Sequence, residues 1–229
     1  MSQGEYVLPF PDRRAAGNLL AERLKRTVTL DEWAERAVVL ALPRGGVAVA
    51  KQVATVLHVP MNVIVTRKIG YPRQPELGVG AVAEGLETPV YDVGLLGQLS
   101  LSPADLGPVV AAERAEVTRR MQVYRGGRPL PAVAGSCVVV VDDGLATGVT
   151  ARAALRSLRA ARVARLVLAA PVASPAAAEQ MSAEADHVII LVTPRWFSSV
   201  GEWYLSFGQL TDADVLALLA RSGPGPGSA

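Results

Sequence analysis

The sequence predicts an α/β fold in which a central, mainly parallel sheet is covered by helices. Short runs of apolar and mostly β-branched residues recur along the chain, and most of them alternate with stretches of helical periodicity. These runs are almost continuously apolar, as strands are when both faces of a parallel sheet are buried. Half of the 229 residues are apolar and 19% are charged, a composition that excludes a disordered chain.

The remaining composition narrows the class of protein. The chain has 20 Arg and 3 Lys against 21 acidic residues, a net charge of +2, so no nucleic-acid partner is expected. No apolar run reaches the roughly 20 residues of a membrane span, and no basic and apolar leader opens the chain. A single cysteine excludes an intramolecular disulfide. We therefore expect a cytoplasmic protein with no membrane partner. Because the net charge is small, any anion is expected to bind at a local cluster of groups and not to a generally basic surface.

Each predicted element follows from its own residues. A helix is expected near the N-terminus, over residues 13–26. Buried strands are expected at the apolar runs 38–42, 61–65, 137–141, 163–169 and 187–192, with a weaker pair at 80–83 and 89–91. Apolar residues at helical spacing predict helices over 47–57 and 109–124. Further helices are expected after the N-cap Ser174 and after the capping box at 211–214.

These elements predict a single domain over residues 1–221. Its core spans about 36–192, a mostly helical insertion about 92–134, and a C-terminal hood about 193–221. The Gly, Pro and Ser residues of 222–229 predict a disordered tail. Residues 67–80, rich in Gly, Pro and charge, are expected to form a long loop, and long loops are often functional.

The strongest functional signal is the segment 138–150, which reads VVVVDDGLATGVT. A buried strand ends in Asp142 and Asp143, at the end of a parallel strand where ligands bind in open α/β sheets. The next loop opens a helix, whose free N–H groups and dipole favour an anion. Carboxylates beside an anion site suit a ligand that has both hydroxyls and a phosphate. A ribose 5-phosphate is such a ligand, because its 2- and 3-hydroxyls can donate to the carboxylates while the loop binds its phosphate. The alternative is a turn in which Asp143 and Thr147 merely cap the helix, which explains one carboxylate but not the pair.

This segment resembles the signature of the type I phosphoribosyltransferases: four apolar residues, two acidic residues, a short loop and Thr-Gly-Gly-Thr. In this chain Val149 stands where that pattern has its second glycine. The resemblance covers about residues 36–192. It implies a type I phosphoribosyltransferase-like fold and transfer from phosphoribosyl diphosphate (PRPP) to a nucleobase or related nitrogenous acceptor. In that reading the 5-phosphate is bound by Gly144, Leu145, Ala146, Thr147, Gly148, Val149 and Thr150. The resemblance also implies a homodimer and Mg²⁺ bridging through PRPP, with Asp142 and Asp143 as candidate ligands.

Two further segments acquire roles through the resemblance. Arg44, Gly45 and Gly46 match the position of the family's diphosphate loop, which often contains a non-proline cis peptide; an arginine with two glycines at a helix start independently suits diphosphate. The alternative is a capped turn with a surface arginine. Residues 67–80 match the flexible catalytic loop, with Lys68, Arg67 and Arg73 as catalytic candidates, against the alternative of a solvated basic loop. The G-x-G-x-x-A pattern at 78–83 lacks a preceding buried strand and is interpreted as a loop entering a short strand.

The remaining features leave several alternatives open. Trp196 and Phe197 could stack on a base, although packing of the hood is the more common role of such clusters. Basic residues at 119, 120, 125 and 128 are interpreted as a solvated helix face. The main alternative function is a PRPP- or nucleotide-binding regulatory module without transferase activity, and a weaker one is hydrolysis of phosphoribosyl compounds. The sequence does not identify the acceptor.

Overall fold

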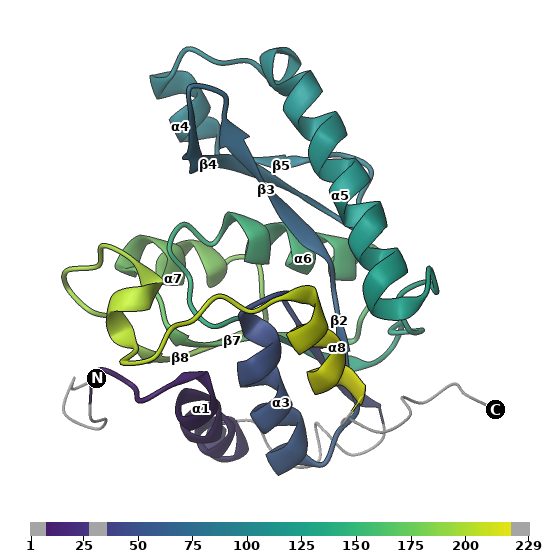
Figure 1. The fold of residues 1–229 in the computed structure, drawn as a ribbon, viewed down its shortest axis with the longest axis vertical. Coiled ribbons are helices and arrows are strands. Elements are labelled where there is room, and N and C mark those ends of the chain that lie inside the picture. Colours follow the sequence, from purple (N-terminus) through teal and green to yellow (C-terminus); the bar gives the residue numbers. More distant parts are fainter. Residues whose placement is uncertain (1–7, 28–35, 221–229) are drawn as a thin grey trace.

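A five-stranded parallel sheet lies at the centre of the computed structural model, which describes residues 8–27 and 36–220 (Figure 1). The strand order is β2-β1-β6-β7-β8, and each neighbouring pair is parallel. The strands are β1 (Ala37–Ala41), β2 (Met61–Val63), β6 (Cys137–Val141), β7 (Arg165–Val172) and β8 (His187–Val192). The predicted α/β class and parallel sheet are confirmed.

Alternate strand residues supply two separate cores, which is why β1 and β6 are apolar and buried at every position. Val39 and Val139 pack in a cluster with α1 (Arg13–Thr27) and α3 (Gly46–Leu57). Leu40 and Val140 point the other way, toward α6 (Val149–Ala160) and α7 (Pro175–Met181). Helices therefore cover both faces of the sheet, and strand residues of either parity are buried.

A second, three-stranded antiparallel sheet forms the upper lobe in Figure 1 with helices of the predicted insertion. Its strands are β3 (Thr66–Tyr71), β4 (Gln74–Ala83) and β5 (Val90–Tyr91). The lobe also contains α4 (Val93–Gln98), the 3₁₀ turn η1 (Pro103–Leu106) and α5 (Gly107–Arg125). The C-terminal segment adds the 3₁₀ turn η2 (Val200–Trp203) and α8 (Asp212–Ala220), which packs against α3 and α5.

The expectation of a long loop over 67–80 was wrong, because these residues form the β3–β4 hairpin. Ile69 and Val79 are fully buried, so the hairpin has an apolar face. Its glycines indicated a loop in the sequence, yet one of them serves close strand packing. A Cβ atom at Gly80 would lie 2.7 Å from the carbonyl oxygen of Val90. Glycine here permits the approach of β5.

A buried ion pair joins the upper lobe to the central sheet. Arg125, at the end of α5, pairs with Glu84, which follows β4, and both side chains are almost completely buried. Glu84 also accepts from the N–H of Val65, and Arg125 donates to the carbonyl of Val63. The interpretation of Arg125 as part of a solvated face was therefore wrong.

Among the described residues, no helix is both long and apolar enough to cross a membrane. The predicted disordered tail, 222–229, lies outside the described residues.

Candidate active site

The segments after β1 and β6 meet at the carboxyl edge of the central sheet, because these two strands are neighbours. A Cβ atom at Gly45 would lie 1.8 Å from Oδ2 of Asp143, and one at Gly46 would lie 2.7 Å from the carbonyl oxygen of Val141. Both positions therefore require glycine. The Pro43–Arg44 peptide bond is cis. The structure thus places the predicted diphosphate loop directly against the predicted acidic pair.

The two carboxylates lie side by side and are mostly shielded from solvent. The N–H of Asp143 donates to Oδ1 of Asp142 over 2.8 Å. Burial, followed by the negative charge of Asp143, raises the pKa of Asp142 well above its usual value. Within the described part of the chain, the N–H donors to the pair reach Oδ1 of Asp142 and Oδ2 of Asp143, and the two carboxyl groups also bond to each other. The pair therefore presents carboxylate oxygens that a hydroxyl or a hard cation could contact.

The loop after Asp143 leads into α6 without a side-chain cap. Gly148 occupies the N-cap position with a φ of 70°, and no side chain there accepts a hydrogen bond. The Thr147 hydroxyl accepts only a long 3.5 Å contact from the N–H of Val149. Asp143 bonds to Arg13 instead of to the helix. Capping therefore does not account for this motif, and the first-turn N–H groups of α6 suit an anion.

Val149, which replaces the family's glycine, has a structural role. Its side chain is 3% exposed and packs in a cluster with Ala81 and Ala83 of β4 and Val90 of β5. The valine therefore attaches the small sheet to the start of α6. The valine adds an apolar contact that a glycine at this position would lack.

The hairpin residues have different surroundings. The Lys68 side chain passes Gly78, where a Cβ atom would lie 2.9 Å from Cδ of Lys68 and 3.8 Å from Val149. Its ammonium group donates to the carbonyl of Glu76 over 2.8 Å. Lys68 is thus close to the start of α6. Arg67 instead pairs with Glu113 of α5 at 2.7 Å, and Arg73 is exposed at the hairpin turn.

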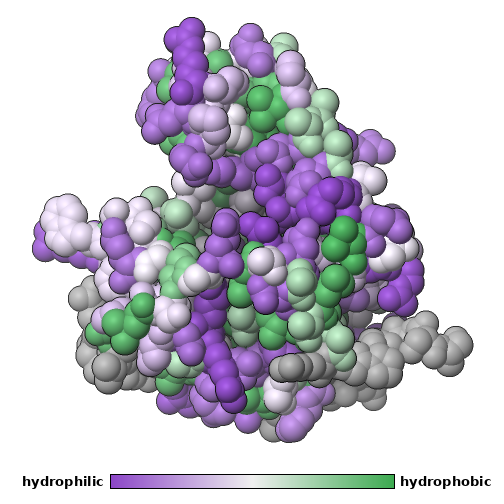
Figure 2. Space-filling view, viewed as in Figure 1, coloured by the Kyte–Doolittle hydropathy of each residue, from purple (hydrophilic) through white to green (hydrophobic). Residues whose placement is uncertain are grey.

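A polar network missed in the sequence joins α5 to α8. The Tyr124 hydroxyl donates to Asp212 over 2.5 Å, and Arg119 bridges Asp212 and Glu116. The side chain of Arg120 is 8% exposed and also pairs with Glu116, so it is not on a solvated face as expected. Hydrogen bonds from the two arginines lower the pKa of Glu116 to about 2. Hydrophilic side chains gather where the upper lobe meets the lower body (Figure 2).

Arg44 lies close enough to this network for its charge to act on Tyr124. Its positive charge acts to lower the pKa of Tyr124, although burial, the largest cause, and the hydrogen bond to Asp212 raise that pKa to about 12. No carboxylate in the described ranges pairs with Arg44. The candidate diphosphate loop therefore carries a guanidinium group that is available to an anion.

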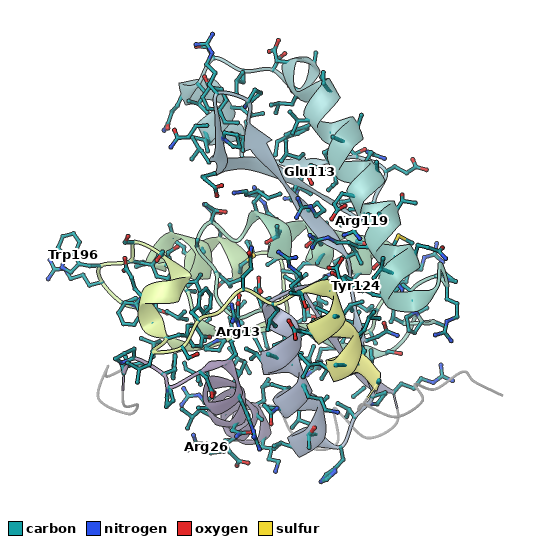
Figure 3. All side chains as sticks on the ribbon, in the orientation of Figure 1. Arg13, Arg26, Glu113, Arg119, Tyr124 and Trp196 are labelled. Carbon is teal, nitrogen blue, oxygen red and sulfur yellow. The ribbon has the colours of Figure 1, made fainter. Side chains whose placement is uncertain are left out.

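The two predicted base-stacking residues differ in their exposure. Trp196 is 81% exposed and points away from the body of the protein (Figure 3), and Phe197 packs against a cluster that includes Phe10. Two other residues reach the acidic pair. Tyr204 donates its hydroxyl to the carbonyl of Asp143 over 2.6 Å, and Arg13 pairs with the Asp143 carboxylate. No local motif marked either residue, because each contact joins distant parts of the chain.

Comparison with known proteins gives a consistent family. A model of the phosphoribosyl transferase domain matches residues 13–204. Mycobacterium tuberculosis proteins from strains CDC 1551 and H37Rv, provisionally named phosphoribosyl transferases, are 39% identical over 213 residues, which is 93% of this chain and 47% of theirs. The chain spans about half the length of the curated relatives it matches. The crystal structure of TT1426 from Thermus thermophilus is 42% identical with a TM-score of 0.75, covering 94% of this chain and 99% of that one.

Proposed function

The chain belongs to the phosphoribosyl transferase family, and we propose that it transfers the phosphoribosyl group of PRPP to a nucleobase or related nitrogenous acceptor, releasing diphosphate. The observation that carries this proposal is the contact between Gly45 and the carboxylate of Asp143. It brings an acidic pair, suited to ribose hydroxyls, against a loop with an available guanidinium. PRPP carries this combination of groups, with hydroxyls in the middle and a phosphate and a diphosphate at its ends.

The ribose 5-phosphate half would lie over the end of β6. Asp142 and Asp143 accept hydrogen bonds from the 2- and 3-hydroxyls through the oxygens to which no described N–H group donates. The 5-phosphate binds to residues 144–150, where the N–H groups at the start of α6 are uncapped. This arrangement fixes the sugar by both ends, so that C1 faces the end of β1.

The diphosphate half would lie over the loop after β1. Arg44, with the N–H groups of Gly45 and Gly46, receives the leaving group. As the bond between C1 and the diphosphate oxygen breaks, positive charge develops on the ribose and negative charge on the diphosphate, while the acceptor nitrogen bonds to C1. Lys68 stabilises the leaving charge from the hairpin. Arg67 can join it only after leaving Glu113, and Arg73 would have to move inward from the hairpin turn.

Mg²⁺ fits the same donor set, since Asp142 and Asp143 offer carboxylate oxygens. In the described part of the chain, no group of three or more His, Cys, Asp or Glu residues could hold a metal ion. The two aspartates would therefore hold Mg²⁺ together with oxygens of PRPP and water. When bound, the ion neutralises part of the diphosphate charge.

We also propose that the protein is a homodimer and that it is located in the cytoplasm.

The test is diphosphate release from PRPP and Mg²⁺, measured with a panel of purine and pyrimidine bases and without any acceptor. The proposal predicts release that depends on one class of base. Release without any base would instead support hydrolysis. Tight PRPP binding with no release under any condition would support a regulatory binding module, and both outcomes would contradict transfer to a nucleobase.

A further inference from the structure

Three segments that are distant in the chain converge on Asp143. Arg13, at the start of α1, donates its Nε to Oδ2 over 2.7 Å, across 130 positions of sequence. Tyr204, after η2, donates its hydroxyl to the Asp143 carbonyl over 2.6 Å. Gly45 closes the third side, since a Cβ atom there would lie 1.8 Å from the same Oδ2. The contacts restrict both the main chain and the carboxylate of Asp143.

The Arg13 side chain is itself rigidly held. Its NH1 group donates to the carbonyl of Gly208 over 2.8 Å, and its guanidinium carbon lies 3.8 Å from the centre of the Phe207 ring. Only 11% of the side chain is exposed. Stacking on one face and hydrogen bonds along its edges leave the guanidinium little freedom. An arginine fixed in this way can hold a carboxylate in one orientation.

The orientation of the Asp143 carboxylate decides what it can bind. The terminal torsion of an aspartate is broad, so an unheld carboxylate samples many orientations. Arg13 donates to Oδ2, and a Cβ atom at Gly45 would lie 1.8 Å from Oδ2 but 3.0 Å from Oδ1, so both contacts are strongest at Oδ2. Among the described residues, no N–H group donates to Oδ1. This oxygen belongs to the residue that our proposed function places against a ribose hydroxyl.

We infer that Arg13 is a positioning residue for the donor sugar, which holds Oδ2 of Asp143 so that Oδ1 is presented to a ribose hydroxyl. The inference rests on the proposed function. Arg13 contacts no reacting atom in this account and acts only through Asp143. The N-terminal helix and the C-terminal segment that carries Gly208 therefore both contribute to recognition of the ribose. An ion pair that competed with the sugar for the carboxylate would have the opposite effect, since its removal would tighten sugar binding.

The experiment compares binding of ribose 5-phosphate with binding of its 2-deoxy and 3-deoxy analogues, in the presence of Mg²⁺, by calorimetry. The variants are Arg13→Gln and Arg13→Lys. Arg14→Gln is the matched control, because Arg14 is the next residue of α1, is exposed, and loses the same charge. A hydrogen bond to a charged group is sufficient for about a tenfold preference for ribose over the deoxy analogue.

The inference predicts that the wild type and Arg14→Gln show this preference, and that Arg13→Gln reduces it to about twofold or less for one of the two hydroxyls. Arg13→Lys should restore part of it, since the charge returns without the planar fork. Neither Arg13 variant should change much the contribution that the 5-phosphate group makes to binding of these sugar phosphates. A merely structural role would weaken all three sugars equally, so the ratio separates positioning from general damage.

Other results would overturn the inference. An unchanged ratio in Arg13→Gln, with discrimination by the wild type, would refute the role of Arg13 and leave the proposed function standing. Tighter binding of ribose 5-phosphate by that variant would show that Arg13 obstructs the site. Failure of the wild type to bind either the sugar phosphates or PRPP would remove both the proposed function and the inference. If Arg13→Gln does not fold, as judged by thermal melting, the Arg13→Lys ratio decides the question.

Discussion

The main chain at Gly45 lies so close to Asp143 that a Cβ atom would be 1.8 Å from Oδ2. Any side chain at position 45 must therefore displace the Asp143 carboxylate, whose Oδ2 is also bonded to Arg13. We predict that Gly45→Ala lowers affinity for Mg²⁺–PRPP at least about tenfold, while it reduces stability by only about 1 kcal/mol. Calorimetry and thermal melting measure the two effects.

A matched control for this change is Gly97→Ala in α4, where a Cβ atom would meet nothing within 4 Å. This variant should bind PRPP as the wild type does and be equally or slightly more stable, because alanine favours a helix. Wild-type affinity in Gly45→Ala would contradict the packing of the diphosphate loop against the acidic pair.

The Lys68 side chain passes Gly78, which lies next to Val149 at the start of α6. If Lys68 stabilises the charge on departing diphosphate, Lys68→Ala should lower kcat roughly 100-fold and change KM for PRPP much less. Lys25→Ala is the control, since Lys25 is exposed and pairs with Glu22 on α1. An unchanged kcat would exclude Lys68 from catalysis.

The valine at position 149 stabilises the contact between α6 and the small sheet. Replacing it with the family's glycine removes a side chain that is 3% exposed and loosens the first helical turn. We predict that Val149→Gly costs about 3 kcal/mol of unfolding free energy, a fall in Tm on the order of 6–12 °C. Val93→Gly is the comparison, because Val93 also begins a helix but is 78% exposed. Similar losses for both variants would show that burial of Val149 contributes nothing.

The Glu116 network predicts a specific dependence of stability on pH. The pKa of Glu116 is lowered to about 2 from an ordinary value of 4.5, mainly by its hydrogen bond with Arg119. A lowered carboxyl pKa contributes stability above the ordinary value, and the contribution disappears as the pH falls toward 2. Because the pair is partly solvated, we expect about 1 kcal/mol.

Urea unfolding of Glu116→Gln at two pH values tests this contribution. The variant should be less stable than the wild type at pH 6. The difference should shrink on acidification to about pH 3, because below pH 4.5 the unfolded state binds a proton that folded Glu116 does not. Glu22→Gln on α1 serves as the control, since Glu22 is exposed and its partner Lys25 is 3.6 Å away. A difference that stays constant with pH would contradict the network.

Local patterns were sufficient to predict the central sheet and the acidic pair. The strands β1, β6 and β7 are nearly continuous apolar runs, and such a run indicates a strand that is buried on both faces. Asp142 and Asp143 follow one of these strands directly, so their place at the sheet edge was determined by sequence proximity. The role of the loop after β1 came from the family resemblance, and the structure places that loop beside the pair because β1 and β6 are neighbouring parallel strands.

Contacts between distant segments could not be predicted in this way. Arg13 reaches Asp143 across 130 positions, and Tyr124 reaches Asp212 across 88. Nothing in the local sequence distinguishes a helix arginine that is buried in an ion pair, such as Arg120, from one on a solvated face. The glycines of the β3–β4 hairpin suggested a loop for a related reason, since the neighbouring strand that requires a small residue is not visible in a local window.

The most direct test of the account is calorimetric titration of Mg²⁺–PRPP into the wild type and into the double variant Asp142→Asn/Asp143→Asn. The account predicts measurable binding by the wild type and a loss of at least roughly 100-fold in the double variant, since two charge-assisted hydrogen bonds and the cation site are removed together. The circular dichroism of the variant should be that of the folded wild type. Equal affinity in both proteins would contradict the assignment of Asp142 and Asp143 to the donor ribose, and with it the proposed function.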